Sequence, residues 1–326
     1  MENEFRKIVV SRTDNIGDVI LSLPVFATLK KSFSEAETIA LVGNYTSGIV
    51  RSSPHVNTVI TSDADESLWA TYKKLKAIGA DVMVALFPRF KIAAAALLAG
   101  IPIRIGTAYR WYSVLFNKKV YEHRKDSVKS EAEYNLTLLE PLGCKEQILD
   151  TTLNIDVRAS RMVDGFANDH CLSKFIAIHP GSGGSASEWD AENFRELIKE
   201  ITNLSDLNVV VTGIASEHYT CAKICEGLGN AINTAGRFSL LEFVALLSKA
   251  DLFISNSTGP LHIAAAVGTP LIGIYPNGKP MTPVRWAPLT DKKIILTPKD
   301  GSNDLSEISV SEVLESVRKM ISPESK

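Results

Sequence analysis

A polar segment between a predicted strand and a predicted helix holds the first residues that could do chemistry. It reads Arg12-Thr-Asp-Asn-Ile-Gly-Asp18 and follows the apolar run Lys7–Ser11. Gly17 permits a tight turn and the close approach of a ligand. Asp18 falls in the first turn of the helix, where an acid also simply favours the helix dipole. On spacing alone the structural role is favoured, and the loop lacks the G-x-G-x-x-G dinucleotide pattern.

A second candidate is the glycine-rich segment His179-Pro-Gly-Ser-Gly-Gly184, which follows the apolar run Phe175–His179. Ser182, Gly183 and Gly184 expose backbone N–H groups at the start of a helix, which suits a phosphate or diphosphate. The segment is not a Walker A loop, because it lacks Gly-Lys-Ser/Thr. We interpret it as a phosphate-binding turn, with an ordinary strand-to-helix turn as the alternative.

A third candidate reads Asn256-Ser-Thr-Gly-Pro-Leu-His262, again where a strand gives way to a helix. Ser257 or Thr258 is placed to cap that helix, and Pro260 suits its first turn. The hydroxyl groups and the free N–H groups up to Gly259 could bind a second part of the same phosphate. His262 lies about one turn into the helix, and alone it is more often a structural histidine than a catalyst.

Glu217 occupies the corresponding position after the predicted strand Asn208–Thr212. An acid at this point can accept both hydroxyl groups of a ribose, as in dinucleotide-binding folds. The alternative is a surface glutamate at a helix start, and taken alone that interpretation is favoured.

Metal and nucleophile chemistry find little support in the sequence. Asp63-Ala-Asp65 resembles a metal-binding D-x-D, but it lies in a polar turn, where aspartates shape the chain. No other cluster has metal-ligand spacing, and no G-x-S-x-G elbow is present. Cys221 and Cys225, four residues apart, are interpreted as small buried side chains. We therefore expect neither a metal nor a cofactor, and the absence of a disulfide framework fits a reducing compartment.

Alternating apolar and amphipathic runs must position these residues, and they indicate βα units on parallel sheets. Two doubly wound units are expected, at roughly 1–160 and 161–326. The cleft between two such units is the default binding site. Strands are predicted at Lys7–Ser11, Thr38–Val42, Thr58–Thr61, Asp81–Phe87, Ile101–Ile105, Phe175–His179, Asn208–Thr212, Asp251–Ser255, Leu271–Tyr275 and Ile294–Leu296. A long helix is predicted over Ile16–Phe33, kinked at Pro24.

Composition narrows the class of protein. The 326 residues carry a net charge of −2, which argues against a nucleic-acid binder acting over its whole length. No signal peptide and no apolar run of about 20 residues is found, so we expect a cytoplasmic protein that at most visits a membrane surface. One irregular, aromatic stretch is locally basic, with seven Lys or Arg against two acids: Arg104, Arg110, Lys118, Lys119, Arg124, Lys125 and Lys129 against Glu122 and Asp126.

Taken together and in order, these motifs resemble glycosyltransferase family 9, the ADP-heptose:lipopolysaccharide heptosyltransferases. The similar segments are RTDNIGDVILSLPVFATLK (Arg12–Lys30), IAIHPGSGG (Ile176–Gly184), ISNSTGPLHIAAAVGTP (Ile254–Pro270) and IGIYPNGKPMTPVRWAPL (Ile272–Leu289). DVMVALFPR and RIG (Arg104–Gly106) look like weaker middle motifs. The likeness covers nearly the whole chain, and four motifs in sequence are far more specific than any one of them.

The resemblance implies an α/β protein of the GT-B fold, with two facing Rossmann-like, doubly wound domains. Residues 1–160 would bind the acceptor and residues 161–308 the nucleotide-sugar, while residues 309–326 would form a helix that packs back on the first domain. It implies an inverting, metal-independent glycosyltransferase that moves a heptose or related sugar, from ADP-heptose, to the lipopolysaccharide inner core or another surface glycan.

The resemblance also assigns roles to residues of this chain. Asp18 would be the general base on the acceptor hydroxyl, opposite the leaving diphosphate. Donors at the two later loops would stabilise the charge that develops on the phosphates. The expected donor-binding residues are His179, Ser182, Gly183, Gly184, Glu217, Ser257, Thr258, Gly259 and His262. The expected acceptor-binding residues are Asn15, Gly17, Arg89 and Arg110, and the basic stretch would meet a phosphorylated acceptor and an anionic membrane face, unless it is only a solvated loop.

Two positions depart from the family pattern. A lysine often precedes the tryptophan after the glycine loop, whereas this chain has Ser187-Glu188-Trp189. Ser257 stands where these enzymes often have an aspartate associated with the donor sugar. Both departures bear on the donor's identity, so a GT-B-fold nucleotide-sugar epimerase and a non-catalytic nucleotide-binding relative stay open as alternatives. The expected partners are a nucleotide-sugar and a lipid-linked or oligosaccharide acceptor, with no nucleic acid, and the chain is expected to be a monomer.

Overall fold

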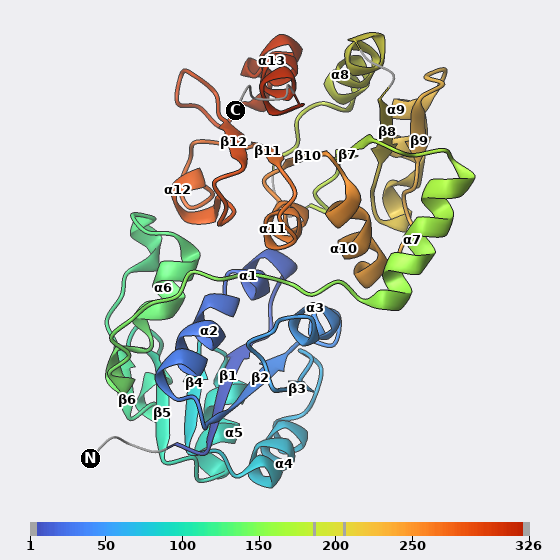
Figure 1. Ribbon diagram of the computed structural model, residues 1–326. Coiled ribbons are helices and arrows are strands. Elements are labelled where there is room, and N and C mark those ends of the chain that lie inside the picture. The colour runs from blue at the N-terminus through green and yellow to red at the C-terminus, as the bar shows by residue number, and fades with distance from the viewer. Residues whose placement is uncertain (1–4, 185–186, 205–206, 322–326) are drawn as a thin grey trace. The chain divides into compact units, whose positions relative to one another are not determined.

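The computed structural model describes residues 5–184, 187–204 and 207–321. Contacts divide the chain into two compact units, Met1–Leu153 and Asn154–Lys326 (Figure 1). The division falls seven residues before the expected boundary at 160. Helix α7 (Val157–Asp169) thus belongs to the second unit, where it packs on α10 (Leu240–Lys249).

The first unit is built on a six-stranded parallel sheet in the order β3-β2-β1-β4-β5-β6. Its central strand β1 (Lys7–Arg12) has Ile8, Val9 and Val10 fully buried, as expected for β-branched residues covered on both faces of a parallel sheet. The other strands are β2 (Glu37–Val42), β3 (Thr58–Thr61), β4 (Val82–Ala85), β5 (Ile103–Thr107) and β6 (Lys118–Val120). The helices are α1 (Ile16–Ile20), α2 (Leu23–Ser32), α3 (Ser47–Arg51), α4 (Leu68–Ile78), α5 (Phe90–Leu98) and α6 (Glu131–Thr137).

The predicted long helix over Ile16–Phe33 is two helices. Helix α1 ends at Ile20, and α2 begins at Leu23 with Pro24 in its first turn. Proline is tolerated there because the N–H it lacks has no partner within the helix anyway. The prediction of one helix kinked at Pro24 is therefore wrong, and the proline instead starts the second helix.

The second unit repeats the arrangement. Its sheet has the order β12-β11-β10-β7-β8-β9, again parallel throughout the pairings described. The strands are β7 (Phe175–His179), β8 (Asn208–Val211), β9 (Ala231–Asn233), β10 (Leu252–Asn256), β11 (Leu271–Ile274) and β12 (Lys293–Leu296). The remaining helices are α8 (Ala191–Leu204), α9 (His218–Cys225), α11 (Gly259–Ala266), α12 (Pro283–Trp286) and α13 (Val310–Ile321).

The last helix packs within the second unit. Val313, Leu314 and Val317 of α13 belong to that unit's hydrophobic core, and the helix contacts α8. We expected residues 309–326 to pack on the first unit, but the apolar face of α13 is already used in the second. Its start is as expected, because Ser309 and Glu312 bond to each other's backbone N–H.

Both sheets have the strand order of a classical Rossmann fold, which confirms the doubly wound α/β prediction. In each sheet the order reverses between two neighbouring strands, β1 and β4 in the first unit and β7 and β10 in the second. Ligands in such folds bind outside the carboxyl ends of the strands at this reversal. The segments that begin at Arg12 and His179, and the one that follows Asn256, leave the sheets at these places.

Candidate active site

In the first unit the reversal point is built around Arg12, the last residue of β1. Its side chain is only 3% exposed and donates to four side chains. Nε donates to Asp14 (2.8 Å), Nη1 to Glu131 (2.9 Å) and to Asn135 (3.1 Å), and Nη2 to Oδ1 of Asp18. A buried guanidinium needs such partners, because an unpaired charge inside a protein is very costly.

Charge at this cluster is balanced by a second arginine. Glu131 is fully buried, and its Oε1 accepts from Arg12 and also from Nη1 of Arg124 at 2.5 Å. Burial raises the pKa of Asp14 to about 6, helped by the neighbouring carboxylate of Asp18 and opposed by Arg12. The pKa of Arg12 is raised, since its three carboxylate partners outweigh the effect of burial. The guanidinium therefore stays charged and fixes the carboxylates around it.

Asp18 is the most exposed of the three carboxylates that Arg12 holds, with Asp14 at 12% exposure close behind it. The side chain of Asp18 is 16% exposed, whereas that of Glu131 is fully buried. It lies in the first turn of α1, as predicted, but its carboxylate is also held by Arg12. An oriented and accessible carboxylate at the carboxyl end of β1 is more than a helix-dipole acid, and it has the placement that a general base requires.

Three of the four predicted acceptor residues lie at the same point of the sheet. Asn15 is the N-cap of α1, although its side chain makes no capping hydrogen bond, and Gly17 lies inside the helix without a positive φ, so no tight turn depends on it. Arg89 follows β4, and its guanidinium lies 4.9 Å from the centroid of the Phe87 ring, which Arg12 approaches at 5.8 Å. Nε of Arg89 is buried and has no hydrogen-bond partner in the described part of the chain.

Arg110 is placed differently. It is exposed in the segment between β5 and β6, one strand further from the reversal point. The structure therefore groups Asn15, Gly17 and Arg89 with Asp18 and leaves Arg110 outside this group.

In the second unit the glycine-rich turn already has acceptors for its N–H groups. Ser182 donates to Oε1 of Glu188 from its N–H (2.8 Å) and from its hydroxyl (2.6 Å). Gly183 N–H points to Oε1 of Glu217 (3.2 Å), and Gly184 N–H to Oγ of Ser182 (3.1 Å). A phosphate could use the Ser182 and Gly183 N–H groups only by displacing carboxylates, so this turn is a less open anion site than the sequence indicated.

Glu217 is a bridge between two loops of the second unit. Besides Gly183 it accepts from Ile214 N–H at 2.8 Å. A Cβ placed on Gly181 would lie 2.0 Å from Oε1 of Glu217, so a side chain at position 181 would displace the Glu217 carboxylate from where it lies. Glu217 thus lies at the predicted place, beside the glycine-rich turn, in contact with protein N–H groups.

The start of α11 is the more open anion site. Thr258 caps this helix through its backbone alone, and its hydroxyl pairs with that of Ser255 at 3.1 Å. His262 is 4% exposed, and its Nδ1 has no hydrogen-bond partner in the described residues. Burial lowers the pKa of His262 to about 4, so it is neutral at pH 7. The N–H of Ser257 donates to the carbonyl of Ile274 at 2.9 Å, and Pro260 has no N–H. An anionic ligand at this helix start could therefore use the N–H groups of Thr258 and Gly259 and the ring of His262.

His179 and Asn256, the last residues of β7 and β10, make side-chain contacts with neighbouring loops of the second unit. Burial lowers the pKa of His179 to about 4, and its Nδ1 lies 3.0 Å from the hydroxyl of Thr212. Asn256 accepts from Trp189 N–H at 2.9 Å and donates to the carbonyl of Pro180 at 2.6 Å. Asn256 therefore holds the glycine-rich turn against the end of β10.

Sequence reasoning missed several residues of both groups. Arg12, Asp14, Glu131 and Asn135 in the first unit, and Glu188 and Asn256 in the second, were not proposed as site residues. Arg12 did leave a signal, since it is a lone charge at the end of an apolar run. Glu131 left no such signal.

Other candidate features have structural explanations. Asp63 accepts from Asn44 N–H at 2.7 Å, as a turn aspartate does. Cys221 is buried in the second unit's core and Cys225 packs against it, which confirms that reading. Among the described residues no three His, Cys, Asp or Glu are grouped to hold a metal ion. No helix in the described ranges is long and apolar enough to cross a bilayer.

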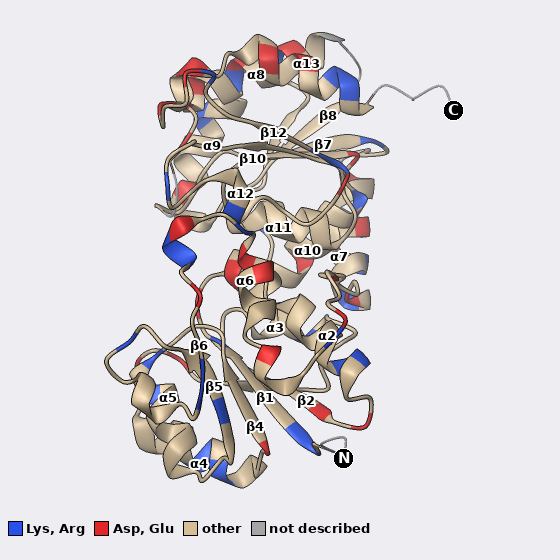
Figure 2. Cartoon of the chain, turned by 90° about the vertical axis from the view of Figure 1, so that its left-hand side faces the viewer, with Lys and Arg blue, Asp and Glu red and all other residues tan. Residues whose placement is uncertain are grey.

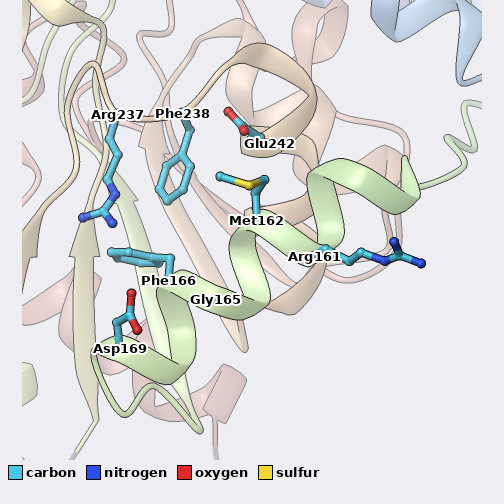
Figure 3. A pocket seen from close by; sticks show the side chains of 8 residues that line it. All are labelled: Arg161, Met162, Gly165, Phe166, Asp169, Arg237, Phe238 and Glu242. Atoms are coloured by element: carbon cyan, nitrogen blue, oxygen red, sulfur yellow. The ribbon is translucent and has the colours of Figure 1, made fainter.

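A separate hollow of about 240 Å³ lies in the second unit, between α7 and the segment that follows β9 (Figure 3). Phe166 and Phe238 meet edge to face at 5.2 Å, and the guanidinium of Arg237 lies 4.4 Å from the Phe166 ring. None of the predicted donor-binding residues lines it.

The two units, each a Rossmann-type sheet with polar residues at its reversal point, have the architecture of the GT-B fold. The chain belongs to glycosyltransferase family 9 (heptosyltransferase), whose sequence profile matches residues 68–312. This membership confirms the resemblance of the sequence motifs and favours a transferase over the epimerase alternative.

Individual relatives agree with this assignment. A Haemophilus influenzae protein named "Putative glycosyltransferase" is 33% identical, over 94% of each chain. Lipopolysaccharide heptosyltransferase 3 of Escherichia coli K12 is 26% identical, over 85% of this chain and 84% of its own. The solved structure of E. coli ADP-heptose lps heptosyltransferase II superposes with a TM-score of 0.80, covering 97% of this chain and 98% of its own at 23% identity.

Proposed function

We propose that this enzyme transfers a heptose or related sugar from a nucleotide-sugar, ADP-heptose by analogy with its relatives, to a lipopolysaccharide inner core or another surface glycan, with inversion and without a metal. The observation that carries the proposal is the contact of Asp18 with buried Arg12 at the reversal point of the first sheet. It gives the chain an accessible carboxylate, fixed in place, on the domain expected to bind the acceptor.

The reaction is a single displacement. Asp18 takes the proton of an acceptor hydroxyl, whose oxygen forms a bond to the anomeric carbon. The bond from that carbon to the diphosphate oxygen breaks, and the nucleoside diphosphate leaves with the electron pair. Because the oxygen attacks the face opposite the leaving group, the configuration is inverted. Arg12 does not touch the substrate in this scheme and instead positions Asp18.

The start of α11 would receive the leaving diphosphate. The backbone N–H groups of Thr258 and Gly259 and the ring of His262 can stabilise its growing negative charge, whereas the N–H of Ser257 already donates to the carbonyl of Ile274. Glu217 would accept the ribose hydroxyl groups, and His179 and the glycine-rich turn up to Gly184 would line the site. This division gives α11 the larger share of phosphate binding, since Glu188 and Glu217 already occupy the N–H groups of Ser182 and Gly183.

Among the residues expected to bind the acceptor, Arg89 is the best supported. Its buried and unpaired Nε beside Phe87 is available to a phosphate or carboxylate of the acceptor. Asn15 and Gly17 would bind closer to Asp18, and Arg110 further out. A lipid-linked acceptor implies an enzyme that works at the cytoplasmic face of the inner membrane, and we propose that it does so as a monomer.

A nucleotide panel tests the donor assignment. ADP and ADP-sugars are expected to raise the melting temperature, because a ligand that binds only the folded protein stabilises it. GDP, UDP and their sugars are the comparison ligands, and we expect them to raise the melting temperature less than ADP and ADP-sugars do. Stabilisation by UDP or GDP but not by ADP would mean that the donor carries a different nucleotide, and no shift with any nucleotide would contradict the proposed function.

A further inference from the structure

Aromatic side chains are exposed together at the carboxyl edge of the first sheet. Phe90, Tyr109, Trp111, Val114 and Tyr121, here called the aromatic patch, are all at least 44% exposed, and Trp111 is 80% exposed. The Trp111 ring stacks on Phe90 with centroids 5.1 Å apart, and Tyr109 meets Tyr121 at 6.1 Å. These residues follow β4, β5 and β6, which are parallel neighbours, so their carboxyl ends lie at one edge.

The segment that carries Trp111 is firmly packed underneath. Tyr112 is buried, and its hydroxyl donates to the carbonyl of Pro88 at 2.6 Å. Phe116 is also buried, and a Cβ on Gly106 would lie 2.5 Å from its ring. The packed segment therefore holds Trp111 out toward solvent, and a cluster of large apolar side chains exposed in this way marks an interaction site.

Exposed basic side chains lie in the same chain segment as most of the aromatic patch. Of the basic residues between Arg104 and Lys129, Arg124 and Lys129 form ion pairs, and Arg104 donates to the carbonyls of Ile101 and Leu115. The others form no ion pair within the described ranges of the chain and are exposed: Arg110, Lys118, Lys119 and Lys125. Lys118 and Lys119 lie on the edge strand β6 (Figure 2).

This combination selects one kind of partner. Aromatic rings with polar edges favour the headgroup level of a membrane, and Lys and Arg are attracted to anionic lipids. Protein interfaces, by contrast, are depleted in lysine. We propose that the aromatic patch and its four free cations dock the first unit on an anionic lipid surface, with the rings inserted at headgroup level and the cations paired with lipid phosphates.

The inference deepens the proposed function, on which it rests for its biological meaning. Asp18 follows β1 at the same carboxyl edge of the sheet as the aromatic patch. A lipid-linked acceptor would therefore be met on the side of the unit that carries the base. Docking itself needs neither donor nor acceptor, so it can be tested apart from transfer.

The test is sedimentation of the full-length protein with vesicles, in the absence of nucleotide and acceptor. We expect binding to phosphatidylglycerol-containing vesicles and little binding to pure phosphatidylcholine. Replacing Lys118 and Lys119 together by alanine should weaken binding about 25-fold, roughly fivefold for each lysine. Trp111→Ala should weaken it roughly tenfold. Added salt should abolish the lysine effect and leave the Trp111 effect, because only the first is screened.

Matched variants separate the patch from general charge and hydrophobicity. Lys73→Ala with Lys76→Ala removes the same charge from α4, and Tyr219→Ala removes a 69% exposed ring from the second unit. Both should bind vesicles like wild type, and circular dichroism checks that each variant is folded. Folded patch variants that bind as well as these controls would overturn the proposal. So would a dimer in sedimentation velocity that Trp111→Ala dissolves, since the patch would then be a protein interface.

Discussion

Nη1 of Arg12 donates to Oε1 of Glu131 at 2.9 Å, across 119 residues of sequence. The contact ties the end of the central strand β1 to α6, which packs on α2. Because Arg12 also holds Asp18, the position of the proposed base depends on Glu131, which lies behind Arg12 and is fully buried.

Replacing Glu131 by alanine should therefore damage both stability and turnover. Two guanidinium groups, of Arg12 and Arg124, would lose a buried partner, at a cost of about 3–5 kcal/mol of unfolding free energy. Urea denaturation measures this loss, and kcat should fall because Asp18 is less well held. Glu140→Ala, on the same segment but exposed, is the control. A loss no larger than that of the control would mean that Glu131 is dispensable.

In the wild-type protein, the carboxylate of Glu188 should weaken donor binding. Its carboxylate occupies the Ser182 N–H and hydroxyl and adds a negative charge beside the expected diphosphate site. Glu188→Gln removes the charge, so calorimetry should find ADP bound about fivefold more tightly. Glu226→Gln, at the end of α9, controls for overall charge. If ADP binds Glu188→Gln no better, or more weakly, the carboxylate does not compete with the diphosphate.

Two buried histidines should make the second unit sensitive to acid. The pKa of His179 and that of His262 are lowered by burial to about 4, from 6.5 in an unfolded chain. Between these values the unfolded chain binds more protons, so stability falls as pH drops from 6.5 toward 4, by about 3 kcal/mol at most for each residue. Asp14 works in the opposite sense, since its pKa is raised to about 6.

The measurement compares wild type with His262→Gln, so that every other titrating group cancels. Urea denaturation at pH 7 and at pH 5 should show a smaller loss of stability for the variant. Equal losses in the two proteins would indicate that His262 is not buried in its neutral form.

Gly181 should be irreplaceable for donor binding. Gly181→Ala would place a Cβ 2.0 Å from Oε1 of Glu217 and force that carboxylate away from the glycine-rich turn. We expect KM for the donor to rise roughly tenfold, by loss of one charged hydrogen bond. Gly229→Ala is the matched control, because nothing lies within 4 Å of a Cβ there. A donor KM like that of the control would remove Glu217 from the site.

Much of the fold could be predicted from the chain, because buried parallel strands are short runs of β-branched residues. Strands β3 and β7 have the predicted bounds. The strands β6 and β9 were missed. Each is three residues long and lies at the edge of its sheet, where no apolar run is required and exposed lysines are typical.

Part of the candidate site could also be anticipated from the sequence. Asp18 and His262 were proposed through the family resemblance, because their positions after buried strands alone favoured a structural role for each. The partners of Arg12 could not be anticipated, since Glu131 and Asn135 reach it only through the packing of α6 on α2. Nor could the sequence show that Glu188 closes on the glycine-rich turn, because that contact depends on where the loop places its N–H groups.

The role of Asp18 is tested most directly by Asp18→Asn, assayed for both sugar transfer and ADP binding. The amide oxygen can still accept from Arg12, so the fold should survive, while the proton acceptor is lost. Asp63→Asn, in a turn of the same unit, is the control. The account predicts a fall in kcat of at least roughly a hundredfold for Asp18→Asn, with unchanged ADP affinity. Transfer at the wild-type rate by the folded Asp18→Asn enzyme would contradict it.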